Sequence, residues 1–154
     1  GPFEDKRYFE GDNELNVVET DHGKLGLLIC YDIFFPELSK SYALKGVDMI
    51  ACISASPSTT RKYFEKVLPA RAIETTSFIF YANLVAREDN IVFWGGDTII
   101  SPKGDVIAKG SYFEEEIVTK KIDLDMIEKA RRGRPVLSDT RPEMMYESAD
   151  SSLK

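Results

Sequence analysis

Apolar residues in this chain gather in short runs between polar turns, a pattern typical of strands and helices packed around one core. Residues 13–20 alternate between polar and apolar side chains and predict a strand. The almost continuous apolar run at 24–30 predicts a second strand with both faces buried. The Asp-His-Gly turn at 21–23 joins the two as a hairpin, because Gly23 can adopt a positive φ.

A strand–helix–strand unit is predicted from this second strand onward. Residues 35–46 predict a helix that begins at Pro36 and ends at Gly46, and residues 47–54 predict a short buried strand. Two strands joined through a helix pair in parallel by a right-handed crossover. Their carboxyl ends then lie at one edge of the sheet, where open α/β proteins bind their ligands.

The rest of the chain adds more strands than helices. In order, the pattern predicts a helix at 61–76 with a kink or break at Pro69, a buried strand at 77–85, a hairpin at 97–111, a strand at 114–125 and a short helix at 126–133. The fold class is therefore α/β, with a mixed sheet in which a βαβ unit is followed by hairpins. Strands that are apolar on both sides need a second covering layer, which we expect another part of the molecule to supply.

Composition narrows the function classes. The 154 residues are 43% hydrophobic and 30% charged, which suits one globular domain. The net charge of −6 disfavours a nucleic-acid partner, because phosphate binding needs a basic face. The basic cluster at 129–134 is interpreted as a solvated helix end. No apolar run approaches the roughly 20 residues of a membrane helix. We also expect no signal peptide at the start of the chain. Two cysteines are too few for a disulfide framework. We therefore expect a cytoplasmic protein with reduced thiols and no membrane association.

Histidine is almost absent, which removes several kinds of catalytic site. His22 is the single histidine and lies in the first hairpin turn, poorly placed to activate a nucleophile. Zinc sites built from several histidine and cysteine ligands lack those ligands here. We expect neither a metal nor another cofactor.

Cys30 is the residue in this chain with the clearest chemical potential. It ends the second strand, directly before the predicted helix, where backbone N–H groups of Tyr31 and Asp32 would point near its sulfur. Such donors favour a thiolate and can form an oxyanion hole. Position alone leaves two interpretations open, a nucleophile or a buried core thiol. Cys52, inside an apolar run with no turn after it, is interpreted as core.

Five ordered motifs resemble the nitrilase superfamily, the carbon–nitrogen hydrolases. They are GKLGLLICYDIFFPE at 23–37, DKRYFEGD at 5–12, LPARAIETTSFIFYANLV at 68–85, WGGDTIISPKGDVIAKG at 94–110, and DLDMIEKARRGRPVLSDTRPEMM at 123–145. They cover nearly the whole chain at family-like spacing. The resemblance implies the carboxyl-terminal part of an α-β-β-α sandwich, with a partial hydrolase domain at 1–133 and an extended arm or tail at 134–154.

The resemblance also implies a reaction. Family members hydrolyse amides, carbamoyl groups or nitriles through a cysteine thioester, with a glutamate as general base and a lysine that stabilises the tetrahedral intermediate. Here Cys30 corresponds to the nucleophile, and the Tyr31 N–H to one oxyanion donor. A second acid of the family corresponds to Asp5, or to Glu4 if the local backbone shifts. A frayed amino terminus that carries both acids without function is the alternative.

Residues around the nucleophile are expected to shape its pocket. Ser54, Ala55 and Ser56 fall where relatives place substrate contacts, and the small Ala55 suggests room for an acyl group. Asp32 is expected to order the turn and Phe35 to pack beside it. Polar residues within apolar surroundings are interpreted as structural hydrogen-bonding groups: Glu37, Arg71, Glu74 and Asn83. Asp97 stands where relatives often have serine.

The family's general base and lysine belong to a half that would precede this sequence. The chain alone is therefore expected to be inactive, and its partners to be that half, a small-molecule amide or nitrile, and further copies in a homo-oligomer. A flavodoxin-like α/β domain with Cys30 as core filler is disfavoured by the late hairpins and by the absence of a phosphate loop after the first strand. Two other functions remain open. One is a carbon–nitrogen hydrolase, amidase rather than nitrilase, that needs the missing half. The other is a non-catalytic binding or regulatory module that keeps the fold.

Overall fold

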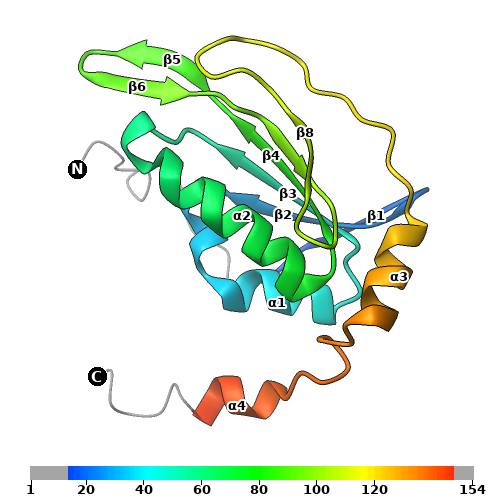
Figure 1. Cartoon of the computed structure of the whole chain (residues 1–154). Coiled ribbons are helices and arrows are strands. Elements are labelled where there is room, and N and C mark those ends of the chain that lie inside the picture. Colours follow the sequence, from blue (N-terminus) through cyan, green and yellow to red (C-terminus); the bar gives the residue numbers. More distant parts are fainter. Residues whose placement is uncertain (1–13, 148–154) are drawn as a thin grey trace.

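The computed structural model describes residues 14–147 and builds them around one six-stranded mixed sheet (Figure 1). The strand order is β1-β2-β3-β4-β7-β8, and β5 and β6 form a separate two-stranded hairpin. The strands are β1 (Val17–Thr20), β2 (Gly23–Ile29), β3 (Met49–Ser54), β4 (Phe78–Asn83), β5 (Val85–Glu88), β6 (Ile91–Trp94), β7 (Thr98–Ile100) and β8 (Val106–Lys109). The α/β class predicted from the sequence is confirmed.

Strands β2, β3 and β4 are parallel, and the outer pairs are antiparallel. Leu28 pairs with Cys52, and Cys52 pairs with Tyr81 across the parallel strands. Strand β1 pairs with β2, β7 with β4, and β8 with β7, each in antiparallel fashion. The carboxyl ends of the three parallel strands therefore meet at one edge of the sheet. Cys30, Ser54 and Asn83 lie along this edge, next to one another in strand order.

Helices α1 (Pro36–Leu44) and α2 (Arg61–Thr75) cover one face of the sheet (Figure 1). The core lies beneath them, where strand side chains such as Leu28, Ile50 and Ile79 meet Phe64 and Leu68 of α2. Helix α2 runs through Pro69 without ending there, so of the kink or break expected at Pro69, the break does not occur. A proline inside a helix removes a single backbone hydrogen bond, and the buried face of α2 retains the helix despite that loss.

The opposite face of the sheet is open. Leu27, Ile29 and Ile53 point to that side and are 46%, 58% and 49% exposed. Their neighbours Leu28 and Cys52 point under the helices and are buried. The apolar runs of β2 and β3 therefore bury one face only within the described residues, whereas Ile99 of β7, on the same side as Leu27, is buried. The expected second layer has no counterpart among the described residues.

Two further predictions need correction. No strand forms at 114–123, which runs as an unpaired segment from the hairpin of β7 and β8 to α3 (Asp125–Gly133). A strand needs an edge to pair with, and the sequence pattern alone does not supply one. The predicted arm also contains a short helix, α4 (Pro142–Glu147), among its described residues.

The basic cluster is only partly solvated. Arg131 of α3 donates to Asp48 Oδ1, the Val47 carbonyl and Thr76 Oγ1, each at 3.2 Å. Lys129 and Arg132 are exposed. Arg131 thus docks α3 against the amino ends of the parallel strands, the edge opposite Cys30. Over residues 14–147, no helix is both long and apolar enough to cross a membrane.

Candidate active site

Cys30 occupies a strained position between strand and helix. Strand β2 ends at Ile29, and Cys30 begins a 3-10 helix, η2 (Cys30–Phe34), with a φ of +49°. This left-handed region costs a residue with a side chain about 1–2 kcal/mol. Such strain persists where the surroundings enforce it, and it clusters at functional sites. Other hydrolases present their nucleophile on a similar strained turn between strand and helix.

Two hydrogen bonds to Asp32 stabilise the turn after Cys30. Asp32 Oδ2 accepts a hydrogen bond from the Ile29 N–H at 3.0 Å, and the Asp32 carbonyl accepts one from the Phe35 N–H at 3.1 Å. The Asp32 carboxylate therefore closes the turn from inside. The rings of Tyr31 and Phe35 meet edge to face, with 5.1 Å between centroids, and Tyr31 is 67% exposed. The half-buried Cys30 thus lies beside an aromatic pair that faces outward.

Cys52 lies next to Cys30 and is not reactive at neutral pH. Its thiol is fully buried and donates weakly to the Cys30 carbonyl, with 3.8 Å between sulfur and oxygen. Burial raises the pKa of Cys52 to about 12, with a smaller contribution from Cys30. Because the thiolate is the nucleophile, Cys52 is inert at neutral pH, in keeping with its interpretation as core.

The loop after β3 is held by Ser56, whereas the buried Ser54 hydroxyl at the end of β3 has no hydrogen-bond partner among the described residues. Ser56 is fully buried, and its N–H donates to Asn83 Oδ1 at 2.8 Å. Its hydroxyl accepts from Trp94 Nε1 at 3.2 Å and shares a hydrogen bond with Thr60 Oγ1 at 2.7 Å. Ser56 therefore anchors the loop and has no free group to offer a ligand. Ala55 is half-buried and has no polar side chain to offer a ligand.

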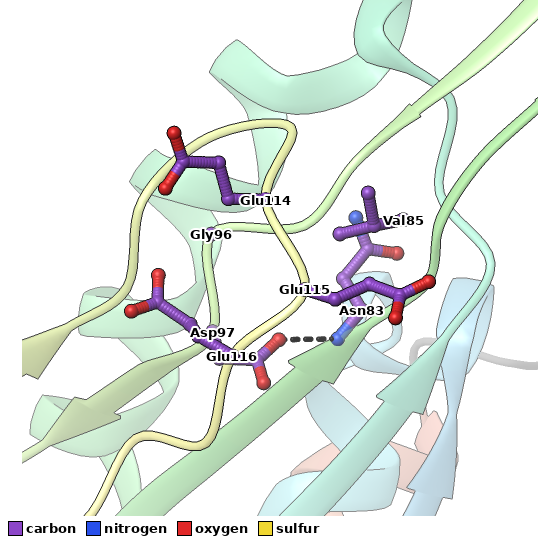
Figure 2. Close-up of a pocket in the computed structure, with 7 residues that line it drawn as sticks. All are labelled: Asn83, Val85, Gly96, Asp97, Glu114, Glu115 and Glu116. Atoms are coloured by element: carbon purple, nitrogen blue, oxygen red, sulfur yellow. Dashed lines mark hydrogen bonds between the residues drawn. The ribbon is translucent and has the colours of Figure 1, made fainter.

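Asn83 joins two loops at the carboxyl edge. Besides binding Ser56, its Nδ2 donates to the Gly95 carbonyl at 3.2 Å. Its backbone N–H donates to Asp97 Oδ1 at 2.9 Å, the dashed line in Figure 2. Asn83 is 9% exposed, and its partners lie 12 to 27 residues away in sequence. Sequence reasoning identified it as a structural polar residue but had no signal for these particular partners.

A small acidic cavity adjoins Asn83. It has a volume of about 140 Å³ and is lined by Asn83, Val85, Gly96, Asp97 and Glu114–Glu116 (Figure 2). Four carboxylates at its wall disfavour an anionic ligand there. In the part of the chain that the structure describes, no group of three or more histidine, cysteine or acidic side chains is arranged to hold a metal ion.

Lys24, Lys40 and Glu37 lie in different places relative to Cys30. Lys24 lies at the start of β2, the end opposite Cys30, with its ammonium 3.8 Å from Glu19. Lys40 Nζ donates to the Glu74 carbonyl at 2.6 Å, and burial lowers its pKa although Glu74 acts in the other direction. Glu37 is exposed in the first turn of α1, where a carboxylate suits the helix dipole. Asp5 and Glu4 lie outside the described residues.

Comparison with known proteins places this geometry in a family. The sequence model of the family described as carbon-nitrogen hydrolase matches residues 1–132. The chain belongs to the carbon–nitrogen hydrolase family. Its sequence is 40% identical over 129 residues to the glutamine-dependent NAD(+) synthetase of Thermotoga maritima, covering 81% of this chain and 22% of that protein. It is 33% identical over 147 residues to a nitrilase of Pyrococcus abyssi, covering 94% and 55%.

Solved structures of carbon–nitrogen hydrolases share the fold. A carbon-nitrogen hydrolase of Helicobacter pylori G27 superposes with a TM-score of 0.88 at 29% identity, covering 97% of this chain and 57% of that one. A variant of the amidase from Nesterenkonia sp. AN1 superposes with a TM-score of 0.80 at 26% identity, covering 96% and 52%. That structure shows covalent addition of the acetamide moiety of fluoroacetamide at the amidase's active-site cysteine. This chain thus spans about half the length of these structures and of the nitrilase, and less of the synthetase.

Proposed function

We propose that this chain supplies the nucleophile of a carbon–nitrogen hydrolase that cleaves small amides through a thioester on Cys30. The observation that carries the proposal is the strained, half-exposed Cys30 at the carboxyl edge of the parallel strands. It is supported by the contrast with Cys52, whose burial leaves it unreactive. Relatives named amidases, among them N-carbamoylputrescine amidase of Solanum lycopersicum and omega-amidase of Xenopus tropicalis, favour an amide over a nitrile.

The proposed reaction has two steps. The Cys30 thiolate attacks the amide carbonyl carbon, so a C–S bond forms and the carbonyl electron pair moves to oxygen. The backbone N–H of Tyr31 is proposed to hold that oxyanion, in a turn that Asp32 keeps closed. Collapse breaks the C–N bond, and the leaving nitrogen takes a proton. Water then adds to the thioester, the C–S bond breaks, and a carboxylic acid and the free thiol result.

Proton transfer in these steps is assigned to groups outside the described residues. A glutamate base and a lysine would come from the half of the domain that precedes this chain in the family pattern, and Asp5 or Glu4 would provide the second acid. Ala55 is proposed to line the acyl pocket, together with the exposed rings of Tyr31 and Phe35. Within residues 14–147, neither Lys24 nor Lys40 lies where it could replace the missing lysine.

The open face of the sheet supports the proposal that another part of the domain packs against this chain. Burying apolar side chains such as Leu27 and Ile53 stabilises an assembly by about 1.5–3 kcal/mol per fully buried side chain. We propose that the preceding half of the domain covers this face and completes the site. A homo-oligomer of the completed domain is a further proposal.

The experiment has two stages. Intact mass and amino-terminal sequencing of the native protein measure whether polypeptide precedes Gly1. The native protein is then incubated with a panel of aliphatic amides, and ammonia release is measured for wild type, Cys30→Ala and, as the matched cysteine control, Cys52→Ala. We expect release that disappears in Cys30→Ala and persists in Cys52→Ala, and none from residues 1–154 alone. Full activity in Cys30→Ala would refute the proposal. No turnover of any amide or nitrile by a native protein that includes the missing half would favour the non-catalytic module.

A further inference from the structure

Arg71 of α2 reaches the end of the turn that carries Cys30. Its Nε donates to the Ile33 carbonyl at 2.8 Å, and its Nη2 donates to the Phe34 carbonyl at 3.3 Å. These two carbonyls belong to the last residues of η2. Carbonyl groups at the end of a helical turn have no partner within it, so a buried turn needs donors from elsewhere. A single guanidinium supplies both.

The guanidinium is itself held in place. Arg71 is 8% exposed, and its Nη1 lies 2.9 and 3.1 Å from the two carboxylate oxygens of Glu74. All three nitrogens of Arg71 are therefore engaged. The Glu74 carbonyl also accepts the Lys40 ammonium from α1, so both helices are tied to this arginine. Such a planar fork cannot be replaced by the single point charge of a lysine.

The turn is thus fixed at both of its ends. Asp32 holds the Ile29 N–H at the entry, and Arg71 holds two carbonyls at the exit. Cys30 lies between them with its φ of +49°. A residue stays in this costly region only when its surroundings determine the backbone from several directions. The fixation at the exit comes from a helix that begins some thirty residues after Cys30 in the chain.

We propose that Arg71 is a positioning residue for the nucleophile. By fixing the last two carbonyls of η2, its guanidinium sets the direction in which the N–H groups of Tyr31 and Asp32 face the Cys30 sulfur. The inference rests on the proposed role of Cys30, although it makes its own prediction about thiol reactivity. A shift of about 1 Å in such a site reduces rates by up to roughly 100-fold.

The test measures the rate at which chloroacetamide alkylates Cys30, with Cys30→Ala as the blank. The variants are Arg71→Ala and Arg71→Lys, and Arg61→Ala on the same helix is the matched control, since Arg61 stacks on Tyr112 and does not touch the turn. We expect alkylation in both Arg71 variants to slow by roughly tenfold or more, and Arg61→Ala to keep the wild-type rate. Thermal unfolding of each variant establishes that it is folded.

Chemical rescue separates positioning from general stability. Guanidinium at millimolar concentration is expected to restore the Arg71→Ala rate, because the ion fits the space of the deleted side chain, whereas methylammonium at equal concentration leaves it slow. In the active native protein, Arg71→Lys should lower kcat and leave KM unchanged. Wild-type alkylation in folded Arg71 variants would overturn the inference, as would equal slowing in Arg61→Ala. If no amide is hydrolysed but the alkylation pattern holds, the proposed function fails and the role of Arg71 stands.

Discussion

At the scale of single residues, the backbone of Cys30 is the feature that distinguishes it from an ordinary core thiol. The motif around Cys30 resembles the cysteine segment of carbon–nitrogen hydrolases and therefore predicts a nucleophile there. The left-handed φ of +49° was not predictable, because cysteine has no preference for that region. The conformation follows from contacts made by Asp32 and Arg71, and the second of these comes from a distant helix.

Replacement of Cys30 tests this strain directly. Glycine adopts a positive φ without steric cost, whereas alanine retains the clash of a Cβ atom. We therefore expect Cys30→Gly to be more stable to unfolding than Cys30→Ala by about 1 kcal/mol. Urea unfolding of the two variants measures the difference. At the exposed turn residue Asp89, which also has a positive φ of 51°, replacement by glycine and by alanine should show the same order. Equal stabilities at position 30 would mean that the residue is not held in the left-handed region.

At the scale of elements, the loops at the carboxyl edge depend on Asn83. Its side chain satisfies the Ser56 N–H and the carbonyls of Ser56 and Gly95, all inside the protein. Asn83→Ala leaves these groups without partners, and each unpaired buried group costs about 1–3 kcal/mol. We expect a loss of at least about 2 kcal/mol in the free energy of unfolding, measured with urea. Asn90→Ala, at the exposed tip of the β5–β6 hairpin, is the control and should change it little. A loss in Asn83→Ala no larger than in the control would contradict the role given to Asn83.

A charged cluster attaches the segment after β8 to helix α2. Glu65 accepts hydrogen bonds from Tyr112 and Lys109, and Arg61 lies 4.4 Å from the centre of the Tyr112 ring. Partial burial alone would raise the pKa of Glu65, but these hydrogen bonds and the nearby cations together lower it below its ordinary 4.5. A lowered carboxyl pKa stabilises the fold above the ordinary value, and this contribution is lost as the pH falls through the folded-state pKa.

Glu65→Gln should therefore change how stability responds to acid. The groups are about one-third exposed, so we expect the variant to lose less than about 1 kcal/mol at neutral pH. That difference from wild type should shrink as the pH falls below 4.5. Thermal unfolding at a series of pH values measures it, with exposed Glu88→Gln as the control. A difference that grows in acid would show that the sign assigned to Glu65 is wrong.

Helices and strands could be predicted from the sequence where a local pattern determines them. The predictions were wrong where pairing with a distant strand determines the structure. The βαβ unit around α1 is predicted by its apolar runs and by Pro36 and Gly46 at the helix ends. All of these signals lie close together in the sequence. Residues 114–123 contain the short apolar run that predicts a strand, but they pair with neither of the outer strands, β1 and β8. A pattern within one segment does not specify a pairing partner. The sequence also could not predict that Arg131 docks α3, because its partners Asp48 and Thr76 are distant in the chain.

At the scale of the whole molecule, the uncovered sheet face should govern how the isolated chain behaves. Exposed apolar patches on a sheet promote association. We expect residues 1–154 alone to self-associate as concentration rises, and Leu27→Lys with Ile53→Lys to reduce this without lowering the melting temperature. Leu44→Lys, on the outer side of α1 and 40% exposed, is the matched control. Sedimentation at several concentrations measures the effect. A monomeric wild-type chain at all concentrations would contradict it.

Acid quenching of the native protein during turnover shows whether Cys30 forms a thioester with an amide substrate. Mass spectrometry of the quenched protein and of its peptides locates any bound acyl group. We predict one acyl mass on the peptide that contains Cys30, released on further incubation in water and absent from Cys30→Ala. Hydrolysis that continues in Cys30→Ala, or an acyl group found on Cys52 instead, would contradict the account.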